Sequence, residues 1–593
     1  MITPFNKYSF LIFHQDYTAF LKELQNLGVV HIIRKNPESP ENLKRQLEKI
    51  NQIKQAIQFL QSRKIPQDKT IPSPDPESVL STIQHAQIEK ERLVQQLNTL
   101  RKEIANLEPW GAFSLDMIAK LKQVGIKVRF FSTSEKKFDP EWLNRYTLEV
   151  ISQSAGTVYF VVFTADNEEI ALDAEENKQP EHAISDSMKL KIEVENKLEE
   201  LEKEFDRLAS VAIPELENLC NRLEEHLDYE LAKSSSEAQA DDKLMVLEGW
   251  VPTSQDAPLQ EFLDREKIVF LIQRPVPGEQ VPILLKNSRY SHLFEPIGKL
   301  FSLPAYVEID LTAFFAPFFT LFFGFCLGDA GYGLLILIAC TLAKSKVNPE
   351  YKSYLSLGQV LGAATLFVGI LTGTMFGVSL IEQSFISPSY RAIILTQDKI
   401  FMLSLILGVI QILFGMGIQV ANRIIQYGFR YAISTMGWIV IILSIPLFIF
   451  FPDYGIINKS VLGLGGLMAA TVILWDPAPI MPNKIANGVY VIYSAATGFF
   501  GDVLSYIRLF ALGVSGGILG LVVNSMAVQF GQLVPFIGPV IFILILVIGH
   551  VGNLLLCSLG AFVHPMRLTF VEFYKNAGFA GGGKPYQPFA YKK

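Results

Sequence analysis

The C-terminal half of this 593-residue chain contains a series of long apolar segments, which limits its possible folds more than any other feature of the sequence. The segments fall at about 312–343, 355–381, 399–423, 431–451, 460–475, 485–530 and 535–575. A helix needs roughly 20 apolar residues to cross the hydrocarbon core of a bilayer. We therefore predict an α-helical polytopic membrane domain over residues 311–593.

Charge divides the chain at about residue 310. Residues 1–310 hold 37 Lys/Arg and 50 Asp/Glu, a net of −13, whereas residues 311–593 hold 15 and 8, a net of +7. This asymmetry predicts an acidic, water-exposed N-terminal half. Because nucleic-acid phosphates are also negative, we expect no nucleic-acid partner.

Targeting and cysteine signals are sparse. The start, MITPFNKYSFLIF, has no basic n-region and no long h-region, so we expect no cleaved signal peptide and a cytoplasmic N-terminal half. The four cysteines form no CxxC pair, and three of them lie in apolar segments. We expect neither a disulfide framework nor a metal site, and no cofactor.

The first 310 residues combine strand-like runs with heptad-like helical runs. YSFLIF, DYTAFLKELQNLG and VVHIIR predict a strand, a helix and a strand in a small α/β lobe. Apolar residues at spacings of three and four then recur over about 43–60, 80–108 and 183–227, as in coiled-coil helices. VRFFS and TVYFVVF predict strands of a second lobe, and LMVLEGWVP, after a polar loop at 233–243, predicts a strand that returns to the first lobe.

These patterns predict a long antiparallel coiled coil with a lobe at each end, whose simplest role is that of a spacer or tether. The expected segments are a proximal α/β lobe (first part, 1–40), a coiled-coil arm (41–109), a distal α/β lobe (110–182), a returning arm (183–230), a return to the proximal lobe with a linker (231–310), and the membrane domain (311–593).

The charges between the apolar segments predict the topology. Lys and Arg residues cluster at 344–352, at 423–430 and at the C-terminus, which the positive-inside rule places in the cytoplasm. Because the N-terminal half is also expected in the cytoplasm, the segment 312–343 must enter the membrane and return to the cytoplasmic side. Three glycines around Asp329 permit the turn. We predict a hairpin here and about eight passes in total, against the alternative of one kinked helix. The last two segments should form two long tilted helices.

Arg508 lies inside the apolar stretch DVLSYIRLFALGVSG (502–516), and no acid at helical spacing neutralises it. An arginine at the bilayer centre costs about 2.5–3.5 kcal/mol on insertion scales, so it usually faces a wet cavity or a counter-charge. On a helical wheel, Gly513, Gly517 and Gly520 lie opposite the arginine and favour close helix packing. We predict that the glycine face contacts the protein's own helices, while the arginine face meets another partner. The alternative is an ion pair with an acid of a neighbouring helix, and the candidates are Asp329, Glu382, Asp502 and Glu572.

A second polar site ends the last apolar segment, in AFVHPMRLTFVEF. His564 and Arg567 share a helix face, and Pro565 between them can loosen the turn. Glu572 follows toward the expected cytoplasmic end. This pattern is typical of a polar path through the membrane, or of an interfacial anchor at the end of a helix.

Four stretches resemble the membrane stator subunit of rotary V-type and A-type ATPases, called subunit a or subunit I. They are EIDLTAFFAPFFTLFFGFCLGDAGYG (308–333), SYIRLFALGVSG (505–516), HPMRLTFVEF (564–573) and GGGKPYQPF (581–589). Their order and spacing match across 300–593, whereas the N-terminal half matches in layout alone.

The resemblance implies that Arg508 faces a ring of proteolipid subunits, with Arg567 as the second arginine of the family. Ions, H⁺ or Na⁺, would pass two offset half-channels during ATP hydrolysis or synthesis, and His564 would contribute to their translocation. A guanidinium stays charged at physiological pH, so it favours ion release from a ring carboxylate and blocks a direct leak. Further polar residues of the half-channels would be Asp502, Ser505, Glu572 and Asp329. Cys557 departs from relatives that carry an acid there.

The same resemblance implies peripheral stalk subunits as partners, with a soluble ATPase head reached indirectly. The chain itself should not be an enzyme. GFAGGGKP (578–585) superficially fits a P-loop, but it follows a membrane helix, and Pro585 replaces the Ser/Thr that would bind Mg²⁺. The alternatives are a secondary ion-coupled transporter, which often shows broken helices in both halves, and a membrane-anchored scaffold that would tolerate loss of Arg508.

Overall fold

The structure, a computed structural model, describes residues 1–34, 41–63, 65–66, 75–154, 156–165, 172–179, 183–239, 243–276, 278–380, 394–450, 460, 463–468, 484–533 and 536–591. Contacts divide the chain into two compact units. One unit is Met1–Ile33 with Ser236–Phe589, and the other is Arg34–Ser235 with Ala590–Lys593.

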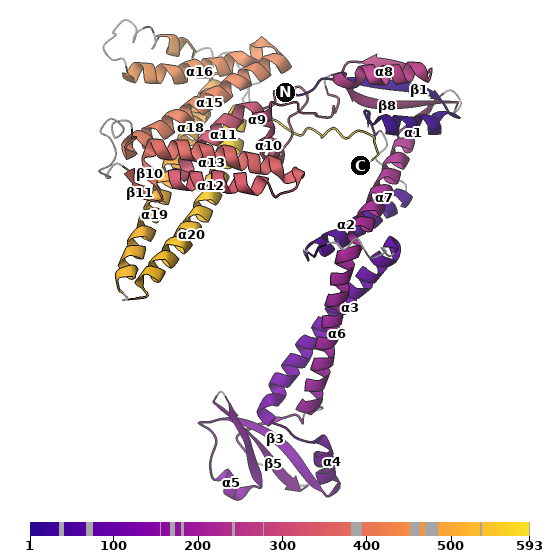
Figure 1. Ribbon diagram of the computed structural model, residues 1–593, viewed down its shortest axis with the longest axis vertical. Helices are drawn as coiled ribbons and strands as arrows, with labels where there is room; N and C mark the ends of the chain where they lie inside the picture. The colour runs from indigo at the N-terminus through magenta and orange to yellow at the C-terminus, as the bar shows by residue number, and fades with distance from the viewer. Residues whose placement is uncertain are drawn as a thin grey trace. The chain divides into compact units, whose positions relative to one another are not determined.

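The second unit contains two successive pairs of helices (Figure 1). They are α2 (Glu41–Gln61) against α7 (Ile213–Ser234), and α3 (Pro76–Leu107) against α6 (Ile184–Val211). Lys90 pairs with Glu202 and Arg101 with Glu195, so the residue numbers run in opposite directions along α3 and α6. Each pair buries the apolar stripe that the heptad-like spacing predicts.

The same unit carries an antiparallel sheet in the order β4-β5-β3-β6. Its elements are η1 (Glu108–Trp110), α4 (Leu115–Gln123), β3 (Ile126–Ser134), α5 (Trp142–Arg145), β4 (Leu148–Ser154), β5 (Thr157–Ala165) and β6 (Glu175–Asn177). VRFFS and TVYFVVF lie in the neighbouring strands β3 and β5. Alternate residues pack on opposite faces, because Phe131 lies in one apolar cluster and Phe130 in another.

A second sheet, in the first unit, joins the beginning of the chain to residues after 236. It is ordered β2-β8-β1-β9, with β7 also paired to β8. Its elements are β1 (Phe5–Phe13), α1 (Tyr17–Leu27), β2 (His31–Ile32), β7 (Glu237–Gln239), β8 (Leu244–Pro252), η2 (Thr253–Gln255), α8 (Asp256–Arg265) and β9 (Val269–Gln273). LMVLEGWVP forms β8 and pairs with β1, as predicted. The prediction of a loop over 233–243 is wrong at β7, because backbone pairing to β8 does not depend on an apolar pattern.

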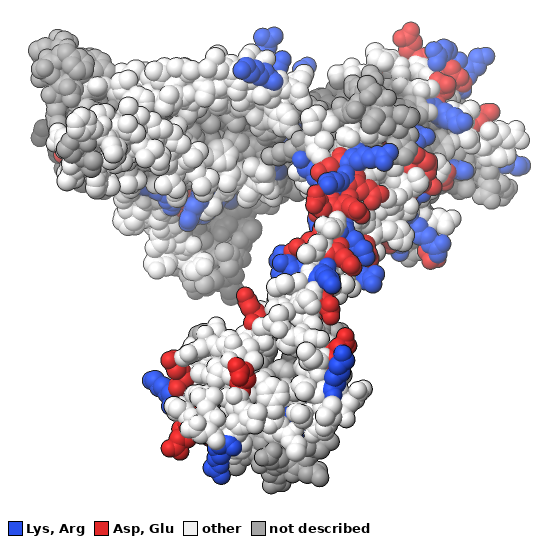
Figure 2. Space-filling model, turned by 60° about the horizontal axis from the view of Figure 1, so that its bottom comes forward, with Lys and Arg blue, Asp and Glu red and all other residues white. Residues whose placement is uncertain are grey.

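The rest of the first unit is mainly helical. Its elements are α9 (Arg289–His292), α10 (Glu295–Phe301), α11 (Thr312–Leu327), α12 (Ala330–Lys344), η3 (Pro349–Tyr351), α13 (Lys352–Thr372), β10 (Thr374–Met375), β11 (Val378–Ser379), α15 (Gln397–Tyr427), α16 (Phe429–Phe450), α18 (Lys484–Ser505), α19 (Ile507–Leu533), α20 (Gly538–Arg567), a π-helix (Leu568–Phe573) and α21 (Tyr574–Asn576). Lys, Arg, Asp and Glu are sparse on the visible face of these helices, in contrast to the arm helices (Figure 2).

The segment 312–343 forms two helices, as predicted. Gly328 ends α11 with φ +55°, and Asp329 begins α12. The Thr372 hydroxyl donates to Gly328 O, and Gly324 and Gly333 both lie against the middle of α13. These contacts make α11 parallel and α12 antiparallel to α13, so the chain reverses at Gly328.

Four helices among the described residues are long and apolar enough to cross a membrane, namely Lys352–Thr372, Gln397–Tyr427, Ile492–Leu533 and Gly538–Asn576. Shorter apolar helices are Thr312–Leu327, Ala330–Lys344 and Phe429–Ser444. Most of the predicted segment 460–475 lies outside the described residues, as does Glu382. The count of eight passes stays a prediction.

The helical wheel drawn through Arg508 needs correction in two places, because the helix is interrupted just before Arg508 and because Gly517 does not lie on the packed face. The structure has α18 end at Ser505 and α19 begin at Ile507, with Tyr506 in a turn between them. Gly513 and Gly520 do lie tightly against backbone, at Phe325 O and at Gly377. Gly517 faces open space, so it does not belong to the packed face.

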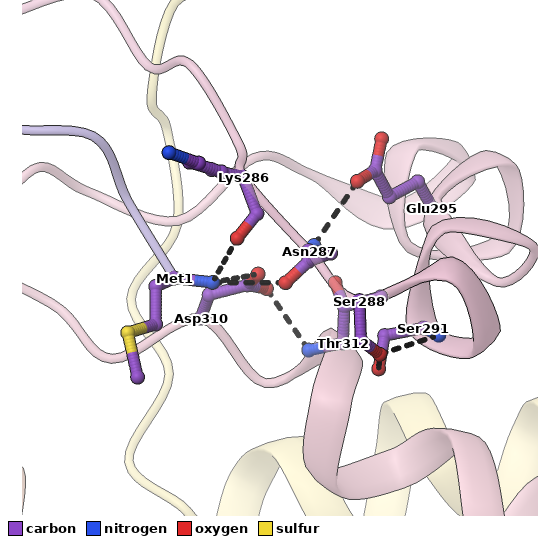
Figure 3. A network of polar contacts seen from close by, with 8 residues as sticks. All are labelled: Met1, Lys286, Asn287, Ser288, Ser291, Glu295, Asp310 and Thr312. Carbon is purple, nitrogen blue, oxygen red and sulfur yellow. Dashed lines mark hydrogen bonds and ion pairs between the residues drawn. The ribbon is translucent and has the colours of Figure 1, made fainter. Parts of the chain in front are cut away.

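Two contacts connect the helical region to the sheet of the first unit. Asp310 caps α11 by accepting from Thr312 N at 2.9 Å, and its other oxygen accepts from the Met1 amino group at 3.3 Å (Figure 3). At the other end of the chain, the tail after α21 returns to the sheet, where Phe589 N donates to Val30 O at 2.8 Å. Met1 therefore contacts the start of the helical region, whereas the C-terminal tail contacts the sheet.

Candidate functional site

Tyr506 organises the local backbone around Arg508. Its N–H donates to Val503 O at 3.1 Å, and its carbonyl accepts from Leu509 N at 3.0 Å, which gives a tight turn of the 3₁₀ type. The Tyr506 ring is fully buried against Gly408 of α15, where a Cβ would lie 2.5 Å from the ring. Glycine at position 408 therefore leaves room for this ring. Arg508 follows two residues later, in the first turn of α19.

Arg508 has no ion pair within the described part of the chain. Its side chain is partly buried, and its Nη1 atom is buried without a hydrogen-bond partner. Arg508 interacts electrostatically with Cys326 on α11, His564 on α20 and Glu572 on the π-helix. The arginine that the sequence singled out therefore remains without a bonded carboxylate inside the described chain.

His564 brings the two arginines into one cluster. The partly buried imidazole lies within electrostatic range of both Arg508 and Arg567. Arg567 itself is exposed at the end of α20. Pro565 lies inside α20, and the next turn widens into the π-helix, in agreement with the predicted loosening of the helix after proline.

The two carboxylates near Arg508, those of Asp502 and Glu572, lie in different environments. Asp502 accepts two hydrogen bonds from Lys575 at 3.1 Å and one from Asn576 at 2.9 Å. Glu572 is 2% exposed, interacts with Ser505, and has a buried Oε2 without a partner. Asp502 is thus paired, whereas Glu572 retains a free acceptor next to the Arg508 charge.

Asp329 lies in a separate place, at the turn between α11 and α12. Its Oδ1 accepts from the backbone N–H groups of Gly331, Tyr332 and Phe376, and its Oδ2 accepts from Gly377 N, all within 2.8–3.1 Å. A buried carboxylate with four backbone donors is a helix cap that also ties down the β10–β11 turn.

Sequence reasoning missed a buried polar network beside Asp329. His550 bonds through Nδ1 to the Tyr332 hydroxyl at 2.7 Å and through Nε2 to Asn524 at 3.0 Å. Asn553 donates to Tyr332 and to Gly516 O, and Cys557 donates to Asn553. The spacing of residues 550, 553 and 557 along one face of α20 was the available signal.

Sequence reasoning also missed Gln411 of α15. This residue is fully buried, and its Oε1 accepts from the Tyr506 hydroxyl at 2.7 Å. Its Nε2 has no partner in the described chain. Gln411 is one of four glutamines in α15, and the sequence does not indicate which of them is buried against another helix.

The fold and this cluster define the class of protein: a membrane protein with a soluble helical arm and a partly buried set of basic and acidic side chains among its apolar helices. Comparison with known proteins then identifies the family. The chain is 30% identical over 446 residues to the A-type ATP synthase subunit I of Methanocaldococcus jannaschii, with 67% of this chain and 63% of that protein covered. It is 26% identical to the V-type ATP synthase subunit I of Chlamydia pneumoniae, with 98% of this chain and 96% of that protein covered. The chain belongs to the subunit I family of A-type and V-type ATP synthases.

A third relative and a solved structure match smaller parts of the chain. The A-type ATP synthase subunit I of Methanothermobacter thermautotrophicus is 32% identical, over 58% of this chain and 51% of that protein, so the chain spans less than two thirds of two of these three relatives. A crystal structure of the cytoplasmic N-terminal domain of subunit I of V-ATPase matches 45% of this chain and all of that chain, at 18% identity and a TM-score of 0.22. No family model matches the chain.

Proposed function

We propose that the chain is the stator subunit of a rotary ATPase and forms two ion half-channels against a ring of proteolipid subunits. The observation that carries the proposal is Arg508, a guanidinium among apolar helices whose Nη1 has no partner in the described chain. An unpaired cation in the membrane is costly unless another group faces it. A carboxylate on each ring subunit would supply that group in turn as the ring rotates.

The proposed roles follow the positions of the side chains. Arg508 would hold the ring carboxylate in its ionised form and separate the half-channels, because a fixed cation repels a transiting one. His564 and Arg567 would line the path beside it. Asp502, Ser505 and Glu572 form a polar route toward Lys575, on the side of the C-terminal tail. For Asp329, the four backbone hydrogen bonds favour a capping role over one in a half-channel.

The proposed arrangement in the cell is a multi-pass membrane protein with its N-terminal half and C-terminus in the cytoplasm. Hydrogen bonds between the C-terminal tail and residues 29–31 support a location of both termini on the same side of the membrane. The helical arm would bind peripheral stalk subunits and so hold the soluble ATPase head indirectly. The chain would couple H⁺ or Na⁺ movement to ATP turnover without catalysing that turnover itself.

The test is ion uptake driven by ATP in membrane vesicles that carry the whole complex. Arg508→Ala and Arg508→Lys are expected to assemble with the proteolipid ring and the ATPase head and to retain part of the ATP hydrolysis. Uptake should be lost in the alanine variant, because no fixed cation then faces the ring. Normal uptake with Arg508→Ala would refute the proposal.

A further inference from the structure

The glycine-rich run GFAGGGKP (578–585) fits a P-loop only superficially, and it is not part of the proposed ion path. In the structure it lies against the segment that precedes α11, backbone to backbone. Gly583 N donates to Leu303 O at 3.1 Å, and a Cβ at Gly583 would lie 2.0 Å from Pro304 O. A side chain at position 583 would therefore push the two backbones apart.

A buried carboxylate holds the start of this tail. Glu308 is 6% exposed, and its Oε1 accepts from Ala580 N at 2.7 Å. Its Oε2 accepts from Gly581 N at 3.2 Å and from Ala305 N at 2.9 Å. Two of these three donors belong to the tail. Because hydrogen bonds to an ionised acceptor are stronger than neutral ones, the carboxylate fixes the tail more firmly than an uncharged side chain would.

Beyond Glu308 the tail continues to the sheet of the first unit. Tyr586 N donates to Ile283 O at 3.0 Å, and the Tyr586 hydroxyl donates to Val29 O at 2.6 Å. Phe589 N donates to Val30 O at 2.8 Å, and the Phe589 side chain is 6% exposed. The tail is therefore bonded to the segment before α11 at one end and to the sheet region at the other.

The chain thus joins the sheet to the apolar helices twice, once through residues 274–311 between β9 and α11 and once through the tail after α21. A single connection keeps rotational freedom about its backbone bonds, whereas two connections that are hydrogen-bonded side by side restrict bending and twisting. A stator needs such resistance, because a turning ring would drag on the membrane helices while the soluble part holds the ATPase head.

We propose that Glu308 and the tail strap, defined as residues 580–589, fix the sheet to the apolar helices while the ring turns. Glu308 is then a positioning residue for the coupling of ion movement to ATP hydrolysis. When the strap opens, part of the torque moves the sheet instead of driving ions. The inference rests on the proposed stator function and adds to it a residue and a segment outside both arginine motifs.

The first experiment measures amide hydrogen exchange in the purified whole complex with the parent chain or Glu308→Gln. A glutamine has one acceptor oxygen and an NH₂ group, so in either orientation of the amide at least one tail N–H loses its acceptor. We expect the amides of Ile283, Tyr586 and Phe589 to exchange about ten-fold faster, which corresponds to about 1.4 kcal/mol, the order of one hydrogen bond.

Glu295→Gln in α10 is the matched control for this change. Glu295 is also 6% exposed, but it accepts its hydrogen bond from Asn287, at 3.1 Å, and one oxygen suffices for that bond. Exchange at the tail should remain parental in this control. Parental exchange in Glu308→Gln as well would overturn the inference.

The second experiment measures coupling in vesicles that carry the whole complex. The readout is the membrane potential generated per ATP hydrolysed, followed with a voltage-sensitive dye that responds to H⁺ and Na⁺ movement alike. With Glu308→Gln, ATP hydrolysis should stay near the parental rate while the potential falls by about half, since a closed strap favoured ten-fold less is open for much of each turnover. A purely structural role of Glu308 would instead lower hydrolysis and potential together, and that outcome would contradict the positioning role.

A variant in the tail itself tests the strap without changing Glu308. Gly583→Ala forces the tail away from Pro304 and should lower the potential in the same way. Lys584→Ala is its control, because the exposed lysine side chain is removed while the backbone bond from Ile283 N to the carbonyl of residue 584 is kept. An unchanged potential with Gly583→Ala would show that the strap does not couple the sheet to the helices.

Arg508→Ala in the same vesicles separates the two levels of the inference. A retained potential there refutes the stator function itself. A lost potential there, combined with parental coupling in both Glu308→Gln and Gly583→Ala, refutes only the role of the strap.

Discussion

Replacement of Asp329 should destabilise the helical region far more than replacement of an exposed acid. The carboxylate accepts four backbone hydrogen bonds, three at Oδ1 and one at Oδ2. A hydrogen bond to a charged group contributes about 1.5–3 kcal/mol, and such contributions do not simply add. We therefore expect Asp329→Ala to lower the free energy of unfolding by at least about 4 kcal/mol. Asp329→Asn can keep the three bonds at its remaining oxygen, so its cost should be about 1–3 kcal/mol.

The assay is the loss of helical structure of the purified chain in mixed micelles as the denaturing detergent is increased. Asp398→Ala is the control, because Asp398 is an exposed acid in the first turn of α15 and should contribute less than about 1 kcal/mol. Equal stability of Asp329→Ala and the parent chain would refute the capping argument. If Asp329→Ala folded normally but abolished ion uptake, Asp329 would instead belong to a half-channel.

Two further predictions concern packing and pH. Gly408→Ala should displace the Tyr506 ring and lower both stability and ion uptake, whereas Gly417→Ala on the same helix faces open space and should change neither, as thermal unfolding and uptake assays would show. In the arm, the hydrogen bond from Lys90 lowers the pKa of Glu202 below its usual value of 4.5, so its stabilising effect is present above pH 4.5 and disappears as the pH falls through the lowered pKa. Amide exchange of α6 should therefore be faster in Glu202→Gln than in the parent at neutral pH, with a difference that vanishes in acid; a difference independent of pH would contradict this.

Much of the fold could be predicted because its signals are local. The apolar stripes of the arm, the strands LMVLEGWVP and TVYFVVF, and the glycine turn at 328 each depend on a few neighbouring residues. The elements that were mispredicted depend on distant partners instead. The strand β7 exists because β8 lies beside it, and the break at Tyr506 exists because Gly408, nearly 100 residues earlier, leaves space for the ring.

The candidate site divides in the same way. Arg508, His564, Arg567 and Glu572 could be found from the sequence, since charged groups in apolar segments are conspicuous wherever they fold. Gln411 could not, because an uncharged amide in an apolar helix gives no charge signal, and the network around His550 left only the spacing of residues 550, 553 and 557 along α20.

The amino-acid sequence alone shows that the C-terminal half is apolar, that an acidic half precedes it, and that Arg508 has no acid at helical spacing. The packing of the helices, in contrast, pairs Asp502 with Lys575, makes Asp329 a helix cap and leaves Glu572 with a free oxygen. The difference arises from the distance along the sequence over which each kind of signal acts. Hydrophobic periodicity and turn preferences act over a few residues, whereas the partner of a buried polar atom is set by the packing of helices that lie far apart in the sequence.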